Sequence, residues 1–341
     1  MIVRENEPLA PRTTLGLGGS ARYLAEIASD DDLVEALGWA RSRGVRAVAI
    51  GGGSNLVVPD EGFGGLVLAI ATRGVEQDGG RVRARAGEPW DALVARSVAA
   101  DLAGLECLSG IPGHVGATPI QNVGAYGQEV ASTIAEVRAY DRAHERFVTL
   151  RPEDCAFAYR DSRFKHAPDA FVVTDVTFSL APGGAPTIAY AELAKKLGDR
   201  RASLVEVRET VIALRRGKAM VVDPADPSTR SAGSFFTNPI VDAMTRDDVV
   251  ARARARGLAD VPTYPQDDGR TKLAAGWLIE RAGIAKGTRR GAVGISDKHA
   301  LALVHHGGGT TRELLALEGE VIARVRQAWG VTLEREPVLL A

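Results

Sequence analysis

Hydrophobic positions in the first half of the chain alternate between helical and strand spacing. Residues Asp30–Arg43 place apolar side chains at helical intervals behind an acidic start, and the β-branched run Val45–Ile50 follows after Gly44. This pattern predicts a helix that leads into a strand. The pattern also predicts strands at Gly65–Ile70, Arg81–Ala86, Ile134–Asp141, Arg146–Leu150 and Phe171–Phe178, and a helix framed by Pro89 and Gly104. Helices and strands in this order indicate an α+β fold.

The second half is more helical, and it follows a segment that breaks both periodicities. This segment, Ala181–Pro186, reads APGGAP and is the predicted linker. The elements predicted after it are helices at Tyr190–Leu197, Leu204–Arg216, Val241–Arg256, Lys272–Ala282 and Thr311–Trp329, and strands near Ala232–Phe236 and Leu301–His305. The predicted domains are residues 1–182, in two α+β parts of about 1–70 and 71–182, and residues 187–341.

Composition restricts the class of protein. With 341 residues, of which 45% are hydrophobic and 25% charged, the chain is long enough for more than one core. A formal net charge of −1 provides no field that gathers nucleic acid or an anionic membrane surface. The amino terminus lacks a signal-peptide core, and no apolar run approaches the ~20 residues of a membrane span, so we expect a cytoplasmic protein. The two cysteines, Cys107 and Cys155, support neither a disulfide framework nor a cysteine metal site, and we expect buried thiols.

Two glycine-rich segments carry the first chemical signal. Residues Ile111–Gly127, IPGHVGATPIQNVGAYG, are too apolar for a solvated loop and too rich in glycine and proline for a helix. Residues Gly51–Asn55, GGGSN, follow a predicted strand; alone they fit a tight hairpin turn equally well. Neither segment matches the G-x-G-x-x-G of a dinucleotide-binding Rossmann unit. Bare backbone N–H groups suit a diphosphate, and apolar residues among the glycines suit a flat ring system such as a flavin.

Seven motifs then occur in the order of a known family. They are TTLGLGGSARYL (Thr13–Leu24), AIGGGSNLVV (Ala49–Val58), SGIPGHVGATPIQNVGAYGQEV (Ser109–Val130), YRDSRFK (Tyr159–Lys165), AGSFFTNP (Ala232–Pro239), KLAAGWLIERAG (Lys272–Gly283) and LERE (Leu333–Glu336). Over nearly its whole length the chain thereby resembles the UDP-N-acetylenolpyruvoylglucosamine reductase family. The resemblance extends to the family's longer form, whose added loop bears a tyrosine that closes over the substrate. Tyr190 in IAYAEL is similar to that tyrosine; the alternative is a helix tyrosine packed on the core.

The resemblance implies a fold and a reaction. The fold is an FAD-binding domain of the vanillyl-alcohol-oxidase type in two α+β parts, followed by a smaller α+β substrate domain whose last strand returns toward the active site. The reaction is the NADPH-dependent reduction of UDP-N-acetylglucosamine enolpyruvate to UDP-N-acetylmuramate, a precursor of peptidoglycan. Hydride passes from NADPH through non-covalent FAD to C3 of the substrate, and a proton is added at C2. We expect a monomer without nucleic-acid or membrane partners.

The same resemblance implies the cofactor contacts. The expected FAD-binding residues lie in the two glycine segments and are Gly51, Gly52, Gly53, Ser54, Asn55, Ser109, Ile111, Pro112, Gly113, Gly116, Ala117, Gln121, Asn122, Gly124, Ala125 and Gly127. His114 lies among them. Oxidases of this FAD fold often tether the flavin through a histidine, so a covalent flavoprotein oxidase is the rival interpretation of His114.

Three residues match the family's catalytic positions. Hydride addition at C3 places negative charge on C2 and the neighbouring carboxylate, and a permanently charged arginine fork suits that carboxylate. Arg160 matches the catalytic arginine, and Ser234 matches the proton donor, although a serine hydroxyl is a weak acid that needs tuning by its neighbours. Glu336 matches the terminal acid, with Glu334 in reserve. A catalytically dead flavin or UDP-sugar sensor is the alternative from another class.

The resemblance to the family also implies residues that contact the substrate, although less directly. The implied residues are Tyr159, Tyr190, Arg215, Lys218, Asn238, Tyr264 and Glu280. For Lys218 and Arg215 a solvated helix end is the alternative. The chain departs from the family pattern at Val338, where an arginine is frequent, and at Thr237, where a lysine is frequent. His305 and His306 are adjacent on a predicted strand and therefore point to opposite faces, so no metal site is expected.

Overall fold

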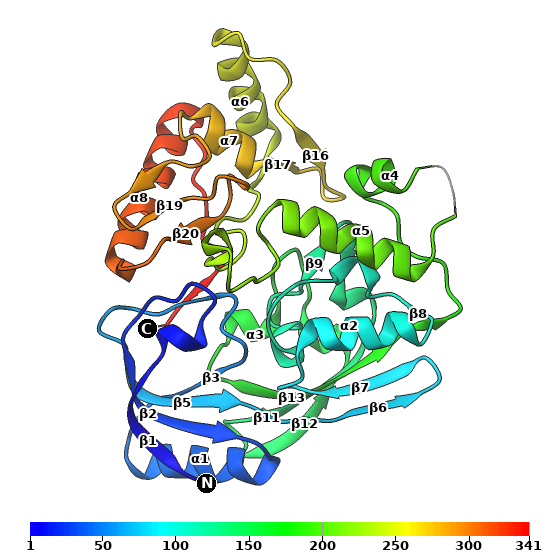
Figure 1. The fold of residues 1–341 in the computed structure, drawn as a ribbon, viewed down its shortest axis with the longest axis vertical. Helices are drawn as coiled ribbons and strands as arrows, with labels where there is room; N and C mark the ends of the chain where they lie inside the picture. The colour runs from blue at the N-terminus through cyan, green and yellow to red at the C-terminus, as the bar shows by residue number, and fades with distance from the viewer. Residues whose placement is uncertain (199–200, 341) are drawn as a thin grey trace. The chain divides into compact units, whose positions relative to one another are not determined.

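The computed structural model describes residues 1–198 and 201–340, and the chain forms two compact units (Figure 1). The first unit consists of Met1–Glu7, Ser20–Gly53 and Phe63–Val221, and the second of Pro8–Gly19, Ser54–Gly62 and Val222–Ala341. The division therefore falls at Val221 and not in the segment APGGAP. The reason is that β14 (Ala181–Pro182) pairs with β8 (Leu102–Ala103), which keeps that segment within the first unit.

The first unit begins with a four-stranded sheet in the order β1-β2-β5-β3. Its strands are β1 (Val3–Pro8), β2 (Ser20–Ile27), β5 (Phe63–Ile70) and β3 (Ala47–Ile50). Both β2 and β3 run parallel to β5. Helix α1 (Asp30–Ser42) starts at Ser29, whose hydroxyl accepts the Asp32 N–H at 3.0 Å. Its buried face, including Leu33 and Leu37, packs with Leu66 and Leu68 of β5.

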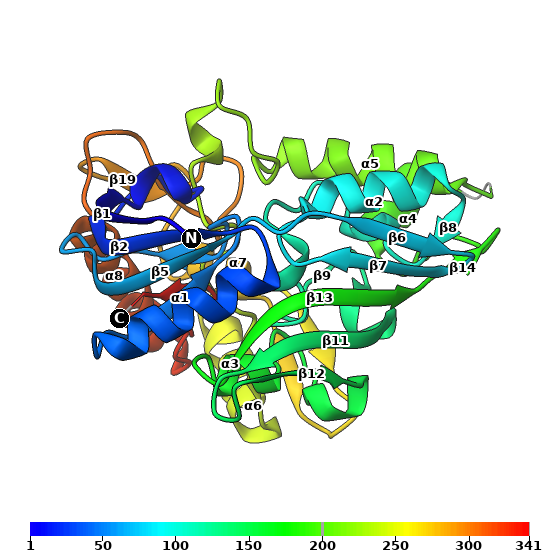
Figure 2. The ribbon, with the colours of Figure 1, turned by 90° about the horizontal axis from the view of Figure 1, so that it is seen from below.

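A five-stranded sheet forms the rest of the first unit's framework (Figure 2). Its order is β12 (Arg146–Leu150), β11 (Ile134–Asp141), β13 (Phe171–Ser179), β7 (Arg81–Arg85) and β6 (Val75–Asp78), antiparallel throughout. Two helices, α2 (Trp90–Ala99) and α5 (Leu204–Gly217), lie side by side in both views. Asp91 of α2 accepts two hydrogen bonds from Arg208 of α5, at 2.7 and 2.8 Å.

Short elements complete the first unit. They are α3 (Arg163–His166), α4 (Ala191–Leu197), β9 (Gly124–Ala125) and β10 (Gln128–Glu129), the last two forming a hairpin. The prediction that Gly104 ends a helix is wrong, because α2 ends at Ala99 and the chain then enters β8. Both cysteines are buried free thiols, as predicted. Burial, with a smaller effect of Glu106, raises the pKa of Cys107 to about 12.

Among its described residues, the second unit has three α-helices, which contribute to one hydrophobic core (Figure 1). These are α6 (Ala243–Ala255), α7 (Ala275–Arg281) and α8 (Thr311–Trp329). One three-stranded sheet has the order β15 (Ile240–Val241), β17 (Thr271–Leu273), β16 (Thr263–Pro265). A second has the order β18 (Arg289–Arg290), β19 (Val293–Ile295), β20 (Leu303–His305). Strands β4 (Leu56–Val57) and β21 (Val338–Leu339) form a parallel pair. None of the helices that the structure describes combines the length and the apolar composition that crossing a bilayer requires.

Two predicted elements of this unit differ from the structure. The helix predicted from Lys272 begins only at Ala275, because Thr271–Leu273 pairs as β17 with strands on both sides. The strand predicted at Ala232–Phe236 is not continuous. Single bridges join Ser231 to Val304 and Phe236 to Arg335, and Gly233 between them has a positive φ of 75°. That backbone turn interrupts regular pairing immediately before Ser234.

Candidate active site

Gly52 of the shorter glycine segment meets the longer segment within the first unit. A Cβ added at Gly52 would lie 2.9 Å from the Cα of Gly113, and one added at Gly116 would lie 2.5 Å from the Cβ of Ala86. Backbone hydrogen bonds fix the longer segment here, since Gly113 O accepts from Trp90 N at 3.0 Å and Gly116 N donates to Ala86 O at 2.8 Å. These positions therefore require glycine for close backbone approach. The hairpin-turn alternative for GGGSN does not account for this contact.

Some side chains expected to contact FAD instead brace the loop. Asn122 is 1% exposed, with φ 40°, and donates to Glu129 Oε2 at 2.9 Å and to Ala158 O at 2.8 Å. Its Oδ1 accepts the Ala131 N–H at 3.2 Å. Ser109 is also buried, and its hydroxyl donates to Glu106 O at 2.6 Å. The structure thus gives both side chains protein partners, and their part in cofactor binding stays a prediction.

Two buried polar atoms in the same loop fit a ligand. Within the described part of the chain, His114 Nδ1 and Gln121 Oε1 are shielded from solvent without a hydrogen-bond partner. Burial and nearby Arg73 lower the pKa of His114, although its hydrogen bond to the Ile70 carbonyl opposes the shift. The ring is therefore neutral at pH 7, and its Nδ1 is an available acceptor. A buried acceptor without a partner costs free energy, which a bound donor group would recover.

Replacing Gln121 by leucine separates cofactor binding from folding. Leucine removes the buried acceptor, so the thermal stability of the flavin-free protein should not fall. Affinity for FAD should fall by roughly tenfold, the equivalent of one net hydrogen bond. Differential scanning fluorimetry and FAD titration measure the two effects, with Gln77→Leu on the exposed strand β6 as the control. Unchanged FAD affinity in Gln121→Leu would show that this side chain does not face the cofactor.

Arg160 stands at the tip of a tight turn in the first unit. Ala158 and Asp161 exchange backbone hydrogen bonds of 3.1 Å, which leaves Tyr159 and Arg160 as the two turn residues. Arg160 has a positive φ of 54°, a conformation that L residues adopt only under constraint. Its guanidinium Nη2 donates to Gly124 O at 2.7 Å, and its own carbonyl accepts Lys165 Nζ at 2.8 Å. The turn thus holds the guanidinium beside the glycine-rich loop.

A cluster of aromatic and charged groups surrounds Tyr126 in the same loop. The rings of Tyr126 and Tyr190 meet edge to face with centroids 5.4 Å apart. Lys218 Nζ lies 5.7 Å from the Tyr126 ring centroid and pairs with Glu192. Tyr190 is 44% exposed and precedes α4 as its N-cap, so it is not the core tyrosine of the alternative interpretation. We call Tyr126, Tyr190, Glu192, Arg215 and Lys218 the tyrosine cluster.

Arg215 is the most buried charge of the tyrosine cluster. Burial lowers the pKa of its guanidinium to about 10. Its Nη2 donates to Met220 O at 2.8 Å, whereas its shielded Nε has no partner within residues 1–198 and 201–340. A Cβ added at Gly110 would lie 3.6 Å from this Nε, so the side chain runs along the backbone at Gly110, directly before the glycine-rich segment Ile111–Gly127. The solvated helix end proposed as an alternative is excluded for Arg215.

Ser234 and Glu336 come together in the second unit. Phe235 O accepts the Glu336 N–H at 3.0 Å, and Thr237 N donates to Glu334 O at 3.0 Å. The Ser234 hydroxyl lies 3.3 Å from Nε2 of His299. Sequence reasoning missed His299, which is the functional candidate that the structure adds. An isolated histidine in GISDKHALAL carries no local signature, and only the fold brings it to the serine.

The remaining implied residues have structural contacts of their own in the second unit. Asn55 donates to Glu336 O at 3.4 Å. Asn238 Oδ1 accepts the Ala275 N–H at 2.9 Å and thereby caps α7. Tyr264 is 52% exposed, and Glu280 Oε1 lies 3.9 Å from Lys286 Nζ. Their roles toward cofactor or substrate stay predictions.

The histidine pair of the second unit has a structural explanation. His305 Nε2 accepts the Gly309 N–H at 3.1 Å, so its Nδ1 carries the proton and donates to Leu15 O at 3.1 Å. His306 Nδ1 lies 3.2 Å from Arg289. Among the described residues, no three or more His, Cys, Asp or Glu side chains are grouped to hold a metal ion.

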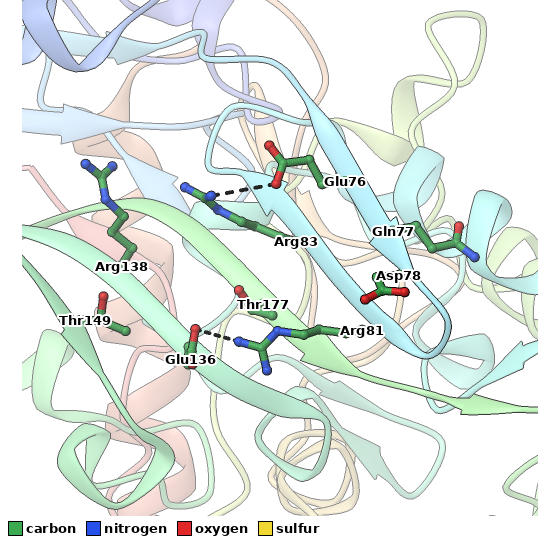
Figure 3. A pocket seen from close by; sticks show the side chains of 9 residues that line it. All are labelled: Glu76, Gln77, Asp78, Arg81, Arg83, Glu136, Arg138, Thr149 and Thr177. Atoms are coloured by element: carbon green, nitrogen blue, oxygen red, sulfur yellow. Dashed lines mark ion pairs between the residues drawn. The ribbon is translucent and has the colours of Figure 1, made fainter.

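A hollow of roughly 570 Å³ on the outer face of the five-stranded sheet does not suit a flavin (Figure 3). Charged and polar side chains line it: Glu76, Gln77, Asp78, Arg81, Arg83, Glu136, Arg138, Thr149 and Thr177. Arg81 pairs with Glu136 at 2.8 Å, and Arg83 pairs with buried Asp175 at 2.9 Å. These charges neutralise one another, and none of the side chains that line the hollow is aromatic or aliphatic, as a flavin ring would favour.

The chain matches known protein families and relatives along most of its length. A family model for the FAD binding domain matches residues 21–151, and a model for the UDP-N-acetylenolpyruvoylglucosamine reductase C-terminal domain matches residues 223–340. The UDP-N-acetylenolpyruvoylglucosamine reductase of Streptomyces avermitilis is 52% identical over 97% of this chain and 93% of its own length. The chain belongs to the UDP-N-acetylenolpyruvoylglucosamine reductase family. The reductase of Thermobifida fusca is 50% identical over 98% of this chain and 97% of its own.

A solved structure agrees with this membership. The crystal structure of the UDP-N-acetylenolpyruvylglucosamine reductase from Thermus caldophilus superposes with a TM-score of 0.69 at 26% identity, covering 100% of both chains. The family resemblance and the α+β fold inferred from sequence are thus confirmed. The FAD-domain match includes both glycine segments, and the reductase C-terminal match begins at residue 223, next to the division between the units.

Proposed function

We propose that this chain reduces UDP-N-acetylglucosamine enolpyruvate to UDP-N-acetylmuramate with NADPH and FAD, in the synthesis of peptidoglycan precursors. The observation that carries the proposal is the 52% identity to a reductase of this name across almost the whole chain. The buried acceptors His114 Nδ1 and Gln121 Oε1, within the FAD-domain match, support the cofactor. Bound FAD supplies the two-electron transfer from NADPH to C3 of the substrate.

Residues of the chain then stabilise the negative charge that develops next to C2 and supply the proton that is added there. Arg160 holds the carboxylate next to C2, where its fixed positive charge stabilises the charge that develops there. Ser234 donates the proton to C2. Its hydroxyl is the weak acid expected from sequence, and the adjacent His299 Nε2 supplies the neighbour that such an acid needs. Glu336 stabilises the enol intermediate; it is partly buried, whereas Glu334 is exposed, which favours Glu336.

The tyrosine cluster and the residues around it bind the nucleotide part of the substrate. Lys218 and Arg215 hold the diphosphate, and Tyr190 covers the ligand. Tyr159, Asn238, Tyr264 and Glu280 are further proposed contacts. We expect a cytoplasmic monomer, and the cytoplasmic location agrees with UDP-sugars and NADPH being cytoplasmic metabolites. Neither nucleic acid nor a membrane has a part in the proposed reaction.

An absorption spectrum tests this function directly. The purified protein should be yellow, and acid or heat should release one FAD per chain into the supernatant. Anaerobic NADPH should bleach the flavin, and UDP-N-acetylglucosamine enolpyruvate should restore the colour. Flavin retained in the denatured pellet would favour the histidine-tethered oxidase. A flavin that NADPH or the substrate leaves unchanged would favour the sensor, and a colourless protein that takes up no FAD contradicts the proposal.

A further inference from the structure

Lys218, a proposed ligand contact, is already neutralised within the protein. Its Nζ lies 2.5 Å from Oε2 of Glu192, which stands in the first turn of α4. The two partners come from different helices, because Lys218 is the C-cap of α5. Each side chain is partly open to solvent, at 40% for Glu192 and 32% for Lys218. The pair is therefore accessible to a dissolved anion.

The surroundings of this pair favour a second negative charge. Arg215 and Lys218 bring two positive charges to the tyrosine cluster, against the single carboxylate of Glu192. Asp91 also acts on Arg215, but its carboxylate already accepts hydrogen bonds from Arg208 and from Gly110 N. Burial raises the pKa of Tyr126 despite the opposing effect of Lys218, so its phenol stays protonated and can donate. The cluster is arranged for an anion, and Glu192 occupies one such position.

Exchange of Glu192 for a ligand requires only rotation of its side chain. Helix α4 is anchored independently, since Leu193 and Leu197 are buried with Val207 and Val211 of α5. A partly exposed ion pair contributes little net free energy, so a doubly charged diphosphate can displace the carboxylate. After displacement, the carboxylate remains on α4 close to the ligand and repels it. Glu192 thus opposes ligand binding both before and after the exchange.

We propose that Glu192 is an internal competitor for Lys218 that sets how tightly this site holds nucleotides bearing a diphosphate. The proposal rests on the proposed function only in assigning such nucleotides as ligands. It makes Glu192 a residue that sets affinity at this site. A carboxylate at this position weakens binding of every diphosphate ligand, reactant and product alike, so that bound nucleotide also leaves more readily.

Binding to the FAD-loaded enzyme without turnover tests the proposal. Glu192→Gln keeps the shape and removes the charge, and the dissociation constants of UDP and NADP⁺ should each fall by roughly three- to tenfold, the scale of a screened ion pair. Isothermal titration calorimetry measures both. Glu209→Gln on α5 removes the same charge from an exposed position and should leave both constants unchanged. Unchanged or weaker binding in Glu192→Gln overturns the proposal.

A double-mutant cycle tests whether Glu192 changes ligand affinity through Lys218. Lys218→Met should weaken both ligands, and in that background Glu192→Gln should no longer tighten them. Equal tightening with and without Lys218 would overturn the competition, because Glu192 would then act only as a general negative charge. If the wild-type enzyme turns over but Glu192→Gln binds UDP and NADP⁺ with wild-type dissociation constants, only this inference is contradicted. A wild-type protein that binds neither UDP nor NADP⁺ contradicts both the inference and the proposed function.

Discussion

Replacing Ser234 by alanine should leave the bleaching of FAD by NADPH near its wild-type rate. Reoxidation by UDP-N-acetylglucosamine enolpyruvate should slow by roughly 10²-fold or more, the scale of a positioned proton donor. The two half-reactions differ because only the second needs a proton at C2 of the substrate. In the structure the Ser234 hydroxyl lies 3.3 Å from His299 Nε2, so alanine removes the group that this histidine contacts.

Anaerobic stopped-flow absorbance follows both half-reactions of this variant. Ser231→Ala is the matched control, since it removes a buried hydroxyl of the same segment that accepts from Gly233 N instead of facing His299. Variants of Arg160 and Glu336 should show the same asymmetry as Ser234→Ala, and so should His299→Leu. Wild-type reoxidation in Ser234→Ala would remove the serine from the proton path. Equal slowing of both half-reactions would indicate displaced flavin instead.

Elements with local signals were predictable from the sequence. Helix α8 has the predicted bounds, Thr311–Trp329, because its ends are encoded next to it. Thr310 and Glu313 form a capping box at its start, and Gly330 ends it with a left-handed φ of 74°. The helices α1 and α5 begin at serine caps in the same way, and each lies within one residue of its predicted bounds.

Elements that depend on distant partners were not predictable. The carboxylate of Asp60 accepts the N–H groups of Thr311 and Arg312 at 2.7 and 2.9 Å, across some 250 residues of chain. Strand β4 likewise pairs with β21 at the far end of the sequence. These contacts draw Ser54–Gly62 into the second unit, although no property of that segment alone indicates it. A linear division at the glycine-rich linker therefore differs from the division in space.

In the candidate site, too, local features were predictable from the sequence and contacts between distant residues were not. Glycine-rich segments are visible in the sequence, and in the structure the backbones of two of them approach closely at Gly52 and Gly113. The direction of a side chain leaves no such signal, so the hydrogen bonds of Asn122 to Glu129 and Ala158 were not predicted. The pairing of Lys218 with Glu192 and of Ser234 with His299 also required the fold. The sequence therefore predicted the loops, and the structure added the hydrogen-bond partners of their side chains.

The variants Gly52→Ala and Gly116→Ala, one in each glycine-rich segment, should lose most of their FAD. The added Cβ meets protein: at Gly116 it would lie 2.5 Å from the Cβ of Ala86, and at Gly52 it would lie 2.9 Å from the Cα of Gly113. Each loop must therefore shift away from its neighbour. Such overpacking costs about 1–3 kcal/mol, which is roughly 5- to 150-fold in flavin affinity if the shift opposes binding.

Gly38→Ala is the matched control for Gly52→Ala and Gly116→Ala. A Cβ at Gly38, on the exposed side of α1, meets nothing within 4 Å, and alanine there should stabilise the helix by about 0.5–1 kcal/mol. The ratio of flavin to protein absorbance after gel filtration, followed by FAD titration, measures the loss. Circular dichroism shows whether each variant is folded. If folded Gly52→Ala and Gly116→Ala proteins bind FAD as tightly as Gly38→Ala, these loops do not hold the cofactor. A loss of FAD confined to the two loop variants, with the fold retained, places the cofactor against the segments where backbone meets backbone.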